Sequence, residues 1–156
     1  MQNDVPPPRL EFALELRVNI APTVDLGTGS FGSRRTVPIT GGTFRGPDIA
    51  GIVLPGGADW QFVESDGLTF VEAHYAIETD DGVRIEVQNC GVRHAPAGVM
   101  ARLTAGESVH AGEYYFRTSP RFYPPAGKYE WLRRSIFVAV GERHADLVVV
   151  QVWRVV

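Results

Sequence analysis

Apolar and polar residues alternate along residues 10–20, and this alternation is the clearest structural signal in the sequence. Every even-numbered position from Leu10 to Ile20 is hydrophobic, whereas Glu11, Glu15 and Arg17 fall between them. A period of two over this length is typical of a long β-strand with one buried face. We therefore expect a strand here, with the prolines at 6–8 as an extended lead-in.

Other segments repeat the pattern. Residues 68–79 and 83–89 alternate in the same way, and Asp80-Asp81-Gly82 between them predicts a hairpin turn. Shorter strands are expected at residues 35–40, 49–54, 60–64, 113–118, 135–140 and 147–155. Residues 22–33 predict a glycine-rich loop and residues 120–127 a proline-rich crossing. Residues 97–105 predict a short helix that ends at Gly106.

This order of elements predicts the fold class. Many strands separated by turns indicate an all-β protein, and the long alternating strands favour a single antiparallel β-barrel spanning residues 1–156, with at most one short helix. The last two expected strands are apolar on both faces, as strands in the middle of a closed or covered sheet are. A barrel of this kind encloses a natural small-molecule pocket.

Two glycine pairs, Gly41-Gly42 and Gly56-Gly57, interrupt the pattern fifteen residues apart. They are typical of hairpin turns or β-bulges. Glycine also lets the backbone or a ligand approach closely. The second pair is followed directly by Asp59 and Trp60, so it could hold an acid and an indole at the rim or inside of a β-structure. Both interpretations stay open on spacing alone.

Composition excludes several classes of function. The 156 residues carry a formal net charge of −3, which argues against a nucleic-acid partner, since phosphate backbones need a basic surface. Cys90 is the single cysteine and the four histidines are far apart in sequence, so no metal site is expected. We find no secretory signal, membrane span, phosphate loop or dinucleotide fingerprint, and we expect a cytoplasmic protein.

A family resemblance covers the chain from about residue 10 to residue 155. The motifs that carry it are residues 34–44, 54–60 and 79–82, then 113–118 with Pro120 and Phe122, then 129–132 and 137–141. Together they resemble domain-of-unknown-function family 3237. The resemblance implies a small β-barrel without a bound cofactor. Some fungal members are cofactor-free cyclases that close an oxygen ring by adding a hydroxyl across an alkene.

The chain departs from the family at two positions. His74 stands where the family usually has Arg, and Arg133 stands where it usually has Asn. Either change could retune a pocket or lie on the surface. Because His74 falls on the polar face of its strand, we expect it at the surface.

Three residues are candidates for catalysis. Asp59, beside an indole in an apolar barrel mouth, is the first choice for acid–base chemistry, or else a turn cap. Tyr75 lies on an apolar strand face and could donate a proton, or else be a satisfied core phenol. Arg117, within an aromatic block, could bind a phenolate or carboxylate, or else form an ion pair with Asp59 or Glu113.

Other residues are candidates for holding a substrate. Asn89 ends an apolar strand face and could orient a carbonyl, or simply cap the strand. Aromatic side chains could line the cavity, although aromatic residues in strands more often belong to the core. They are Phe44, Trp60, Phe116, Phe122 and Trp131.

These residues lead to a hypothesis for function. We expect a cofactor-free cyclase or isomerase that acts by acid–base catalysis on an aromatic or enone-type small molecule. The alternative is a non-catalytic carrier or sensor barrel, and a third possibility is an interaction protein whose barrel is a scaffold. Since apolar residues remain on the outer faces, we also expect a homodimer or larger assembly.

Overall fold

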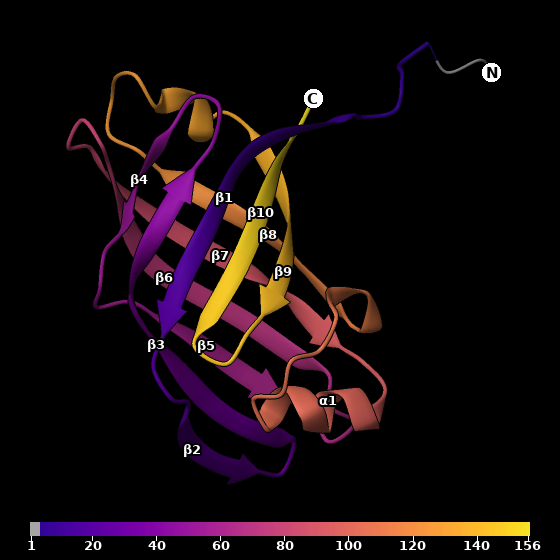
Figure 1. Cartoon of the computed structure of the whole chain (residues 1–156). Coiled ribbons are helices and arrows are strands. Elements are labelled where there is room, and N and C mark those ends of the chain that lie inside the picture. Colours follow the sequence, from indigo (N-terminus) through magenta and orange to yellow (C-terminus); the bar gives the residue numbers. More distant parts are fainter. Residues whose placement is uncertain (1–3) are drawn as a thin grey trace.

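Ten β-strands of the computed structural model, which describes residues 4–156, form one antiparallel sheet that closes on itself (Figure 1). The strands are β1 (Leu10–Ile20), β2 (Val24–Gly29), β3 (Gly32–Arg45), β4 (Ala50–Val53), β5 (Ala58–Val63), β6 (Thr69–Thr79), β7 (Arg84–His94), β8 (Tyr115–Tyr123), β9 (Ile136–Arg143) and β10 (Leu147–Val155). The helices are α1 (Ala97–Thr104) and the short 3-10 turns η1 (Ala111–Glu113) and η2 (Glu130–Leu132).

The barrel closes at β1, which pairs with β10 on one side and with β3 on the other. The sheet runs from β1 through β10, β9, β8 and β7 to β6. The strands β4 and β5 then both lie between β6 and β3, one after the other along the same gap. The predicted all-β antiparallel barrel with one short helix is therefore confirmed, and in Figure 1 the strands β6 and β7 cross behind β1 and β10.

The two ends of the barrel are closed differently (Figure 1). At one end, η2 places buried Tyr129 and Leu132 against a core that includes Leu14, Ile85 and Phe137. At the other end lie α1 and the β2–β3 hairpin. There Leu103 of α1 packs in a smaller cluster with Val71, Val109, Tyr114 and Phe116. The η2 end is thus filled by side chains, which leaves the α1 end as the place for a cavity.

Two predicted loops are strand over part of their length, so those predictions were wrong there. Residues 22–33 contain β2 and the start of β3, which form a hairpin with Val24 opposite Thr36. Residues 120–123 are the end of β8, where Pro120 lies opposite Asn89, whereas residues 124–127 lie outside any strand, as predicted. Proline and glycine lower strand propensity locally, but pairing with a long neighbouring strand outweighs that preference here.

The two glycine pairs have different structures. Gly41 and Gly42 lie inside β3, where the pairing with β1 shifts register beside Asn19, so the bulge interpretation is confirmed for this pair. A side chain at Gly42 would collide with the backbone carbonyl of Arg17, because β3 and β1 lie close together there. Gly56 has a φ of 107° in the turn between β4 and β5, as the turn interpretation predicted.

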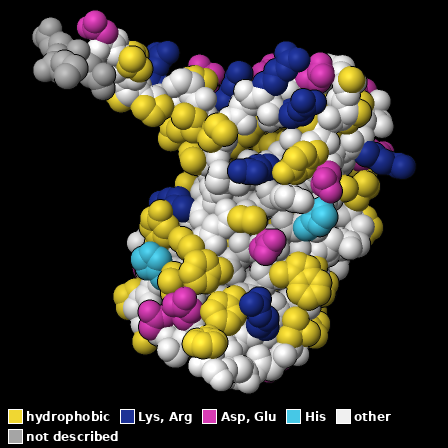
Figure 2. Space-filling model, turned by 180° about the vertical axis from the view of Figure 1, so that it is seen from behind, with side chains coloured by type: hydrophobic (Ala, Val, Ile, Leu, Met, Phe, Trp, Pro, Cys, Tyr) yellow, Lys and Arg dark blue, Asp and Glu magenta, His cyan; other side chains and the backbone are white. Residues whose placement is uncertain are grey.

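Apolar side chains remain on the outside of the barrel. On β9, Phe137 and Ala139 point inward and are buried, whereas Ile136 is 67% exposed and Val138 is also exposed. Figure 2 views the barrel from the side of β6 and β7 and shows hydrophobic patches between charged side chains. Among residues 4–156, no helix is both long enough and apolar enough to cross a bilayer.

Candidate active site

A cavity of about 50 Å³ occupies the barrel lumen near the α1 end. Its wall is mostly aliphatic, and β1, β3 and β10 contribute residues such as Val18, Ile39 and Val150. The polar side chains in the wall are Asp59, Gln61, Tyr75, Asn89, Arg93, Thr118 and Arg143. The lumen therefore combines aliphatic side chains with a concentrated set of hydrogen-bonding groups.

Asp59 of β5 points into this cavity because its strand alternates between lumen and solvent. Its Oδ1 accepts a hydrogen bond of 2.9 Å from the backbone N–H of Glu72, and its Oδ2 accepts one of 2.7 Å from Nε2 of Gln61. Burial raises the pKa of Asp59, although both hydrogen bonds and the nearby Arg93 and Arg143 act in the opposite direction. The carboxylate is thereby made more basic than a solvated one.

Gln61 connects Asp59 to a cation. Its Oε1 accepts a 2.7 Å hydrogen bond from Nε of Arg35, while its amide nitrogen donates to Asp59. Gln61 is buried, so this three-residue chain lies in the wall of the barrel. No ion pair formed within residues 4–156 includes Asp59. The amide thus orients the carboxylate while keeping it out of a direct salt bridge.

Tyr75 of β6 is the second titratable group of the lumen. It is 6% exposed, and burial together with the charge of Asp59 raises the pKa of its phenol. Within the described part of the chain, no residue accepts a hydrogen bond from its hydroxyl. Tyr75 is therefore a neutral donor that faces the cavity with its proton available.

Several buried polar atoms of the lumen have no partner among residues 4–156. They are Oδ1 of Asn89, Nε of Arg93 and Oγ1 of Thr118. All three residues line the cavity. Because burying a polar group without a hydrogen bond costs free energy, such groups are expected where a ligand completes their bonding. The predicted placement of Asn89, Tyr75 and Asp59 in the lumen is confirmed.

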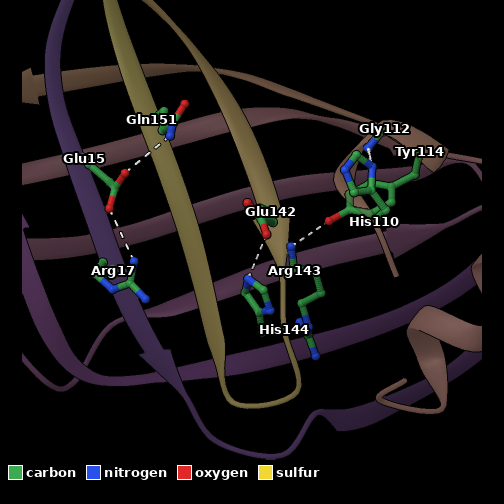
Figure 3. Close-up of polar contacts among 9 residues, drawn as sticks. All are labelled: Glu15, Arg17, His110, Gly112, Tyr114, Glu142, Arg143, His144 and Gln151. Carbon is green, nitrogen blue, oxygen red and sulfur yellow. Dashed lines mark hydrogen bonds and ion pairs between the residues drawn. The ribbon is translucent and has the colours of Figure 1, made fainter. Parts of the chain in front are cut away.

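Arg143 reaches the same region from the end of β9 (Figure 3). Its backbone N–H donates a 2.9 Å hydrogen bond to the hydroxyl of Tyr114, which fixes the end of the strand. The neighbouring Glu142 contacts His144 at 3.1 Å. The carboxylate of Glu142 is thus already paired with His144.

Arg117 does not lie in the lumen, so the structure does not support its candidate role in binding a substrate there. In β8 the inward positions are Phe116 and Thr118, and Arg117 is exposed between them. Its guanidinium lies 5.1 Å from the ring centre of Tyr115 and donates to the carbonyl oxygen of Phe116 at 3.1 Å. The predicted alternative, an ion pair with Asp59 or Glu113, does not occur either.

The aromatic candidates divide into three groups. Phe116 lines the cavity. Phe44 and Phe122 belong to the main core and Trp131 packs against it, which agrees with the alternative that aromatic residues fill the barrel. Trp60 is 54% exposed on the outer face of β5, so its prediction as a cavity residue was wrong. It directly follows the inward-facing Asp59, and strand alternation sends it outward.

The two positions that depart from the family are at the surface. His74 is exposed and its Nε2 lies 2.9 Å from Oε2 of Glu86, as expected from the polar face of its strand. Arg133 is also exposed. Among the described residues, no three His, Cys, Asp or Glu side chains are grouped as metal ligands would be.

Strand parity could have identified some of the lumen residues that we missed. Gln61 has the same parity as Asp59, so it shares the inward face. The inward direction of Arg35 follows from Val37, a buried residue two positions further along the same strand. Arg93 and Arg143 lie beyond the predicted ends of their strands at residues 89 and 140, so their inward directions required the true lengths of β7 and β9.

Comparison with known proteins places this barrel in a family. A family model described as "Protein of unknown function (DUF3237)" matches residues 8–155. The chain belongs to the DUF3237 family. A UPF0311 protein of Rhodopseudomonas palustris is 41% identical over 150 residues, which are 95% of this chain and 98% of the relative.

Solved structures agree with this assignment. The crystal structure of that Rhodopseudomonas palustris protein, itself of unknown function, superposes with a TM-score of 0.92 and covers 97% of this chain and 99% of its own. A β-barrel-like protein from Acinetobacter baumannii, 38% identical, covers 99% and 100% with a TM-score of 0.86.

A more distant relative is an enzyme. The hydroalkoxylation enzyme phnH of Penicillium herquei is 32% identical over 81 residues, which are 52% of this chain and 54% of the enzyme. The similarity therefore covers about half of each chain.

Proposed function

We propose that this protein is a cofactor-free cyclase or isomerase that works by acid–base catalysis in the barrel lumen. The observation that carries the proposal is the pair formed by Asp59 and Tyr75 at one small cavity. Burial raises the pKa of both groups. One is therefore a basic carboxylate and the other a neutral proton donor, as this chemistry requires.

The proposed reaction adds a hydroxyl group of the substrate across its own conjugated alkene. Asp59 removes the hydroxyl proton, the oxygen forms a C–O bond to the alkene carbon, and the π electrons move to a conjugated carbonyl oxygen. Tyr75 donates a hydrogen bond to that oxygen as its negative charge develops. The proton on Asp59 is then returned to the carbon next to the carbonyl. Atoms and electrons balance without any co-reactant.

Two features of the lumen support these roles. The carboxylate of Asp59 is fixed by Gln61 and by the backbone of Glu72, so its free lone pairs are directed by the protein rather than by water. The surrounding aliphatic wall lowers the local polarity, which strengthens the interaction of Tyr75 with a developing oxyanion. The distant relation to a hydroalkoxylation enzyme favours the same reaction class.

The test uses 7-hydroxyhept-3-en-2-one, a compact hydroxy-enone whose ring closure is followed by its loss of absorbance. We expect the protein to accelerate closure, Asp59→Asn to abolish the acceleration, and Tyr75→Phe to reduce it by about ten- to a hundredfold, as loss of one oxyanion donor does. Asp66→Asn, which changes an acid in an exposed turn, is the matched control and should leave the rate unchanged. Equal rates for the protein and Asp59→Asn would refute the role of Asp59.

A second candidate function is a non-catalytic binding barrel, a carrier or sensor. The mostly aliphatic wall of the cavity favours it, because such a surface can hold an apolar molecule without reacting with it. The same experiment separates the two functions. Saturable binding of the probe without any turnover, unchanged by Asp59→Asn, would support the carrier.

A further inference from the structure

Arg93 is the most unusual residue of the barrel, because its charge is buried and unpaired. It lies at the end of β7 opposite Phe116 of β8 and is only 4% exposed. Its guanidinium carbon is 5.4 Å from the ring centre of Phe116. Its Nε is buried without a hydrogen-bond partner, and none of the ion pairs within residues 4–156 includes Arg93.

The neighbours of Arg93 add positive charge rather than neutralise it. Arg35 and Arg143 approach from β3 and β9, and the carboxylate whose charge acts on both Arg93 and Arg143 is Asp59. Three cations and one anion give this group a formal charge of +2 when Asp59 is ionised. Burial and the two like charges lower the pKa of Arg93 to about 10, so it still carries its charge at neutral pH.

The nearby acids cannot supply the missing anion. Asp59 already accepts hydrogen bonds from Gln61 and from the backbone of Glu72. Glu142 contacts His144 (Figure 3), and Glu113 contacts Arg102 at 3.3 Å. Asp25 accepts from the backbone of Gly27. An uncompensated buried guanidinium is costly, so the excess charge indicates a ligand rather than an internal partner.

Arg93 and Arg143 also lie between two cavities of the protein. Both line the lumen cavity, and both line a larger hollow of about 370 Å³ that we call the vestibule. The vestibule lies between the β2–β3 hairpin, which contributes Thr28 and Ser33, and α1, which contributes Thr104. A ligand that enters from the vestibule therefore meets these two guanidinium groups before it reaches Asp59 and Tyr75.

We propose that Arg93, with Arg143, binds a carboxylate of the small molecule that enters the lumen. A guanidinium matches a planar carboxylate with two parallel hydrogen bonds. The lumen cavity has room for only about three to five water molecules, which suits a compact carboxylate beside an apolar group. This inference names the substrate class for the proposed function and rests on it, since the carboxylate would hold the substrate against Asp59.

The experiment measures binding of acetate and benzoate by calorimetry, with acetamide and benzamide as uncharged analogues of the same shape. We expect saturable binding of the carboxylates and none of the amides. Arg93→Met should weaken carboxylate binding by about ten- to a hundredfold, because hydrogen bonds to a charged group are lost. Arg17→Met, which changes an exposed arginine paired with Glu15 on β1 (Figure 3), should have no effect.

Folding and catalysis are separated by two further measurements. Without ligand, Arg93→Met should melt at the same temperature or higher, since an unpaired buried charge is removed. Asp59→Asn should bind carboxylates as tightly or more tightly, because a negative charge leaves the site.

The anion site is overturned if the amides bind as well as the carboxylates, if no carboxylate binds, or if Arg93→Met binds like the unchanged protein. If Asp59→Asn stays active while Arg93→Met loses binding, the proposed role of Asp59 fails and the anion site stands.

Discussion

Gln61 donates a 2.7 Å hydrogen bond to Asp59 from two positions further along the same strand. Both side chains point into the lumen because residues two apart share a strand face. The same Gln61 accepts from Arg35, so the amide separates a carboxylate from a guanidinium that would otherwise attract it directly. The basicity of Asp59 therefore depends on an uncharged neighbour.

Replacing Gln61 by Met should raise the pKa of Asp59 further. The hydrogen bond from Gln61 lowers this pKa in the native protein, and a thioether of similar length cannot donate one. The pKa is measured by following the side-chain carboxyl carbon of Asp59 by NMR during a pH titration. Gln88→Met, on the exposed face of β7, is the control and should leave the titration unchanged. A lower pKa in Gln61→Met would show that Arg35 moves onto the carboxylate.

Asp59 should make the protein less stable as the pH rises. Its folded-state pKa is raised, so the native protein binds this proton more tightly than the unfolded chain does. The stabilisation is fully present below the unfolded pKa of about 3.8 and is lost as the pH rises through the folded pKa.

The free energy of unfolding, measured by urea titration at several pH values, tests this relation. The free energy of unfolding of the unchanged protein, relative to that of Asp59→Asn, should fall as the pH rises from the unfolded to the folded pKa of Asp59. Above the folded pKa the difference between the two proteins should stay constant. A difference that does not change with pH would contradict the raised pKa.

Much of the fold follows from the sequence because alternation is a local property. The range 10–20 matches β1, in which the even-numbered residues from Leu14 to Ile20 are buried while Leu10 and Phe12 are exposed. The range 147–155 matches β10, which was predicted from a continuous apolar segment rather than from alternation. The boundaries of β3 could not be predicted, because its Gly41-Gly42 pair is accommodated by a bulge against β1 rather than by a turn. That arrangement depends on a partner strand over twenty residues earlier in the chain.

The site was predictable only in part. Tyr75 and Asn89 lie on clear apolar strand faces, and parity alone places them in the lumen. Arg117 stands in a block of aromatic residues whose two faces look alike in sequence, so its direction could not be settled there. The charge cluster of Arg35, Arg93 and Arg143 joins three strands, and the sequence gives no sign of which strands lie near one another across a barrel.

The assembly state stays a prediction, and we expect a homodimer or larger. Ile136 and Val138 are exposed on β9, and an apolar outer face of a barrel is favourably covered by a second copy. Light scattering at micromolar concentration should give at least twice the mass of one chain. Ile136→Lys should shift the protein toward monomer, whereas Ser65→Lys in an exposed turn should not. A monomer for the unchanged protein would rule the assembly out.

Gly57 should be required for the position of Tyr75. A β-carbon at residue 57 would collide with that of Tyr75 and would lie 2.6 Å from the carbonyl oxygen of His74, so β6 would have to move. Gly57→Ala should therefore lower the free energy of unfolding by about 1–3 kcal/mol, as overpacking does, and should weaken any ligand binding in the lumen. Gly98→Ala in α1 has nothing within 4 Å of the added carbon and should stabilise the protein by about 0.5–1 kcal/mol, since alanine suits a helix better. Both effects are read from urea unfolding curves, and Gly57→Ala with native stability and native binding would show that β6 tolerates the added methyl group.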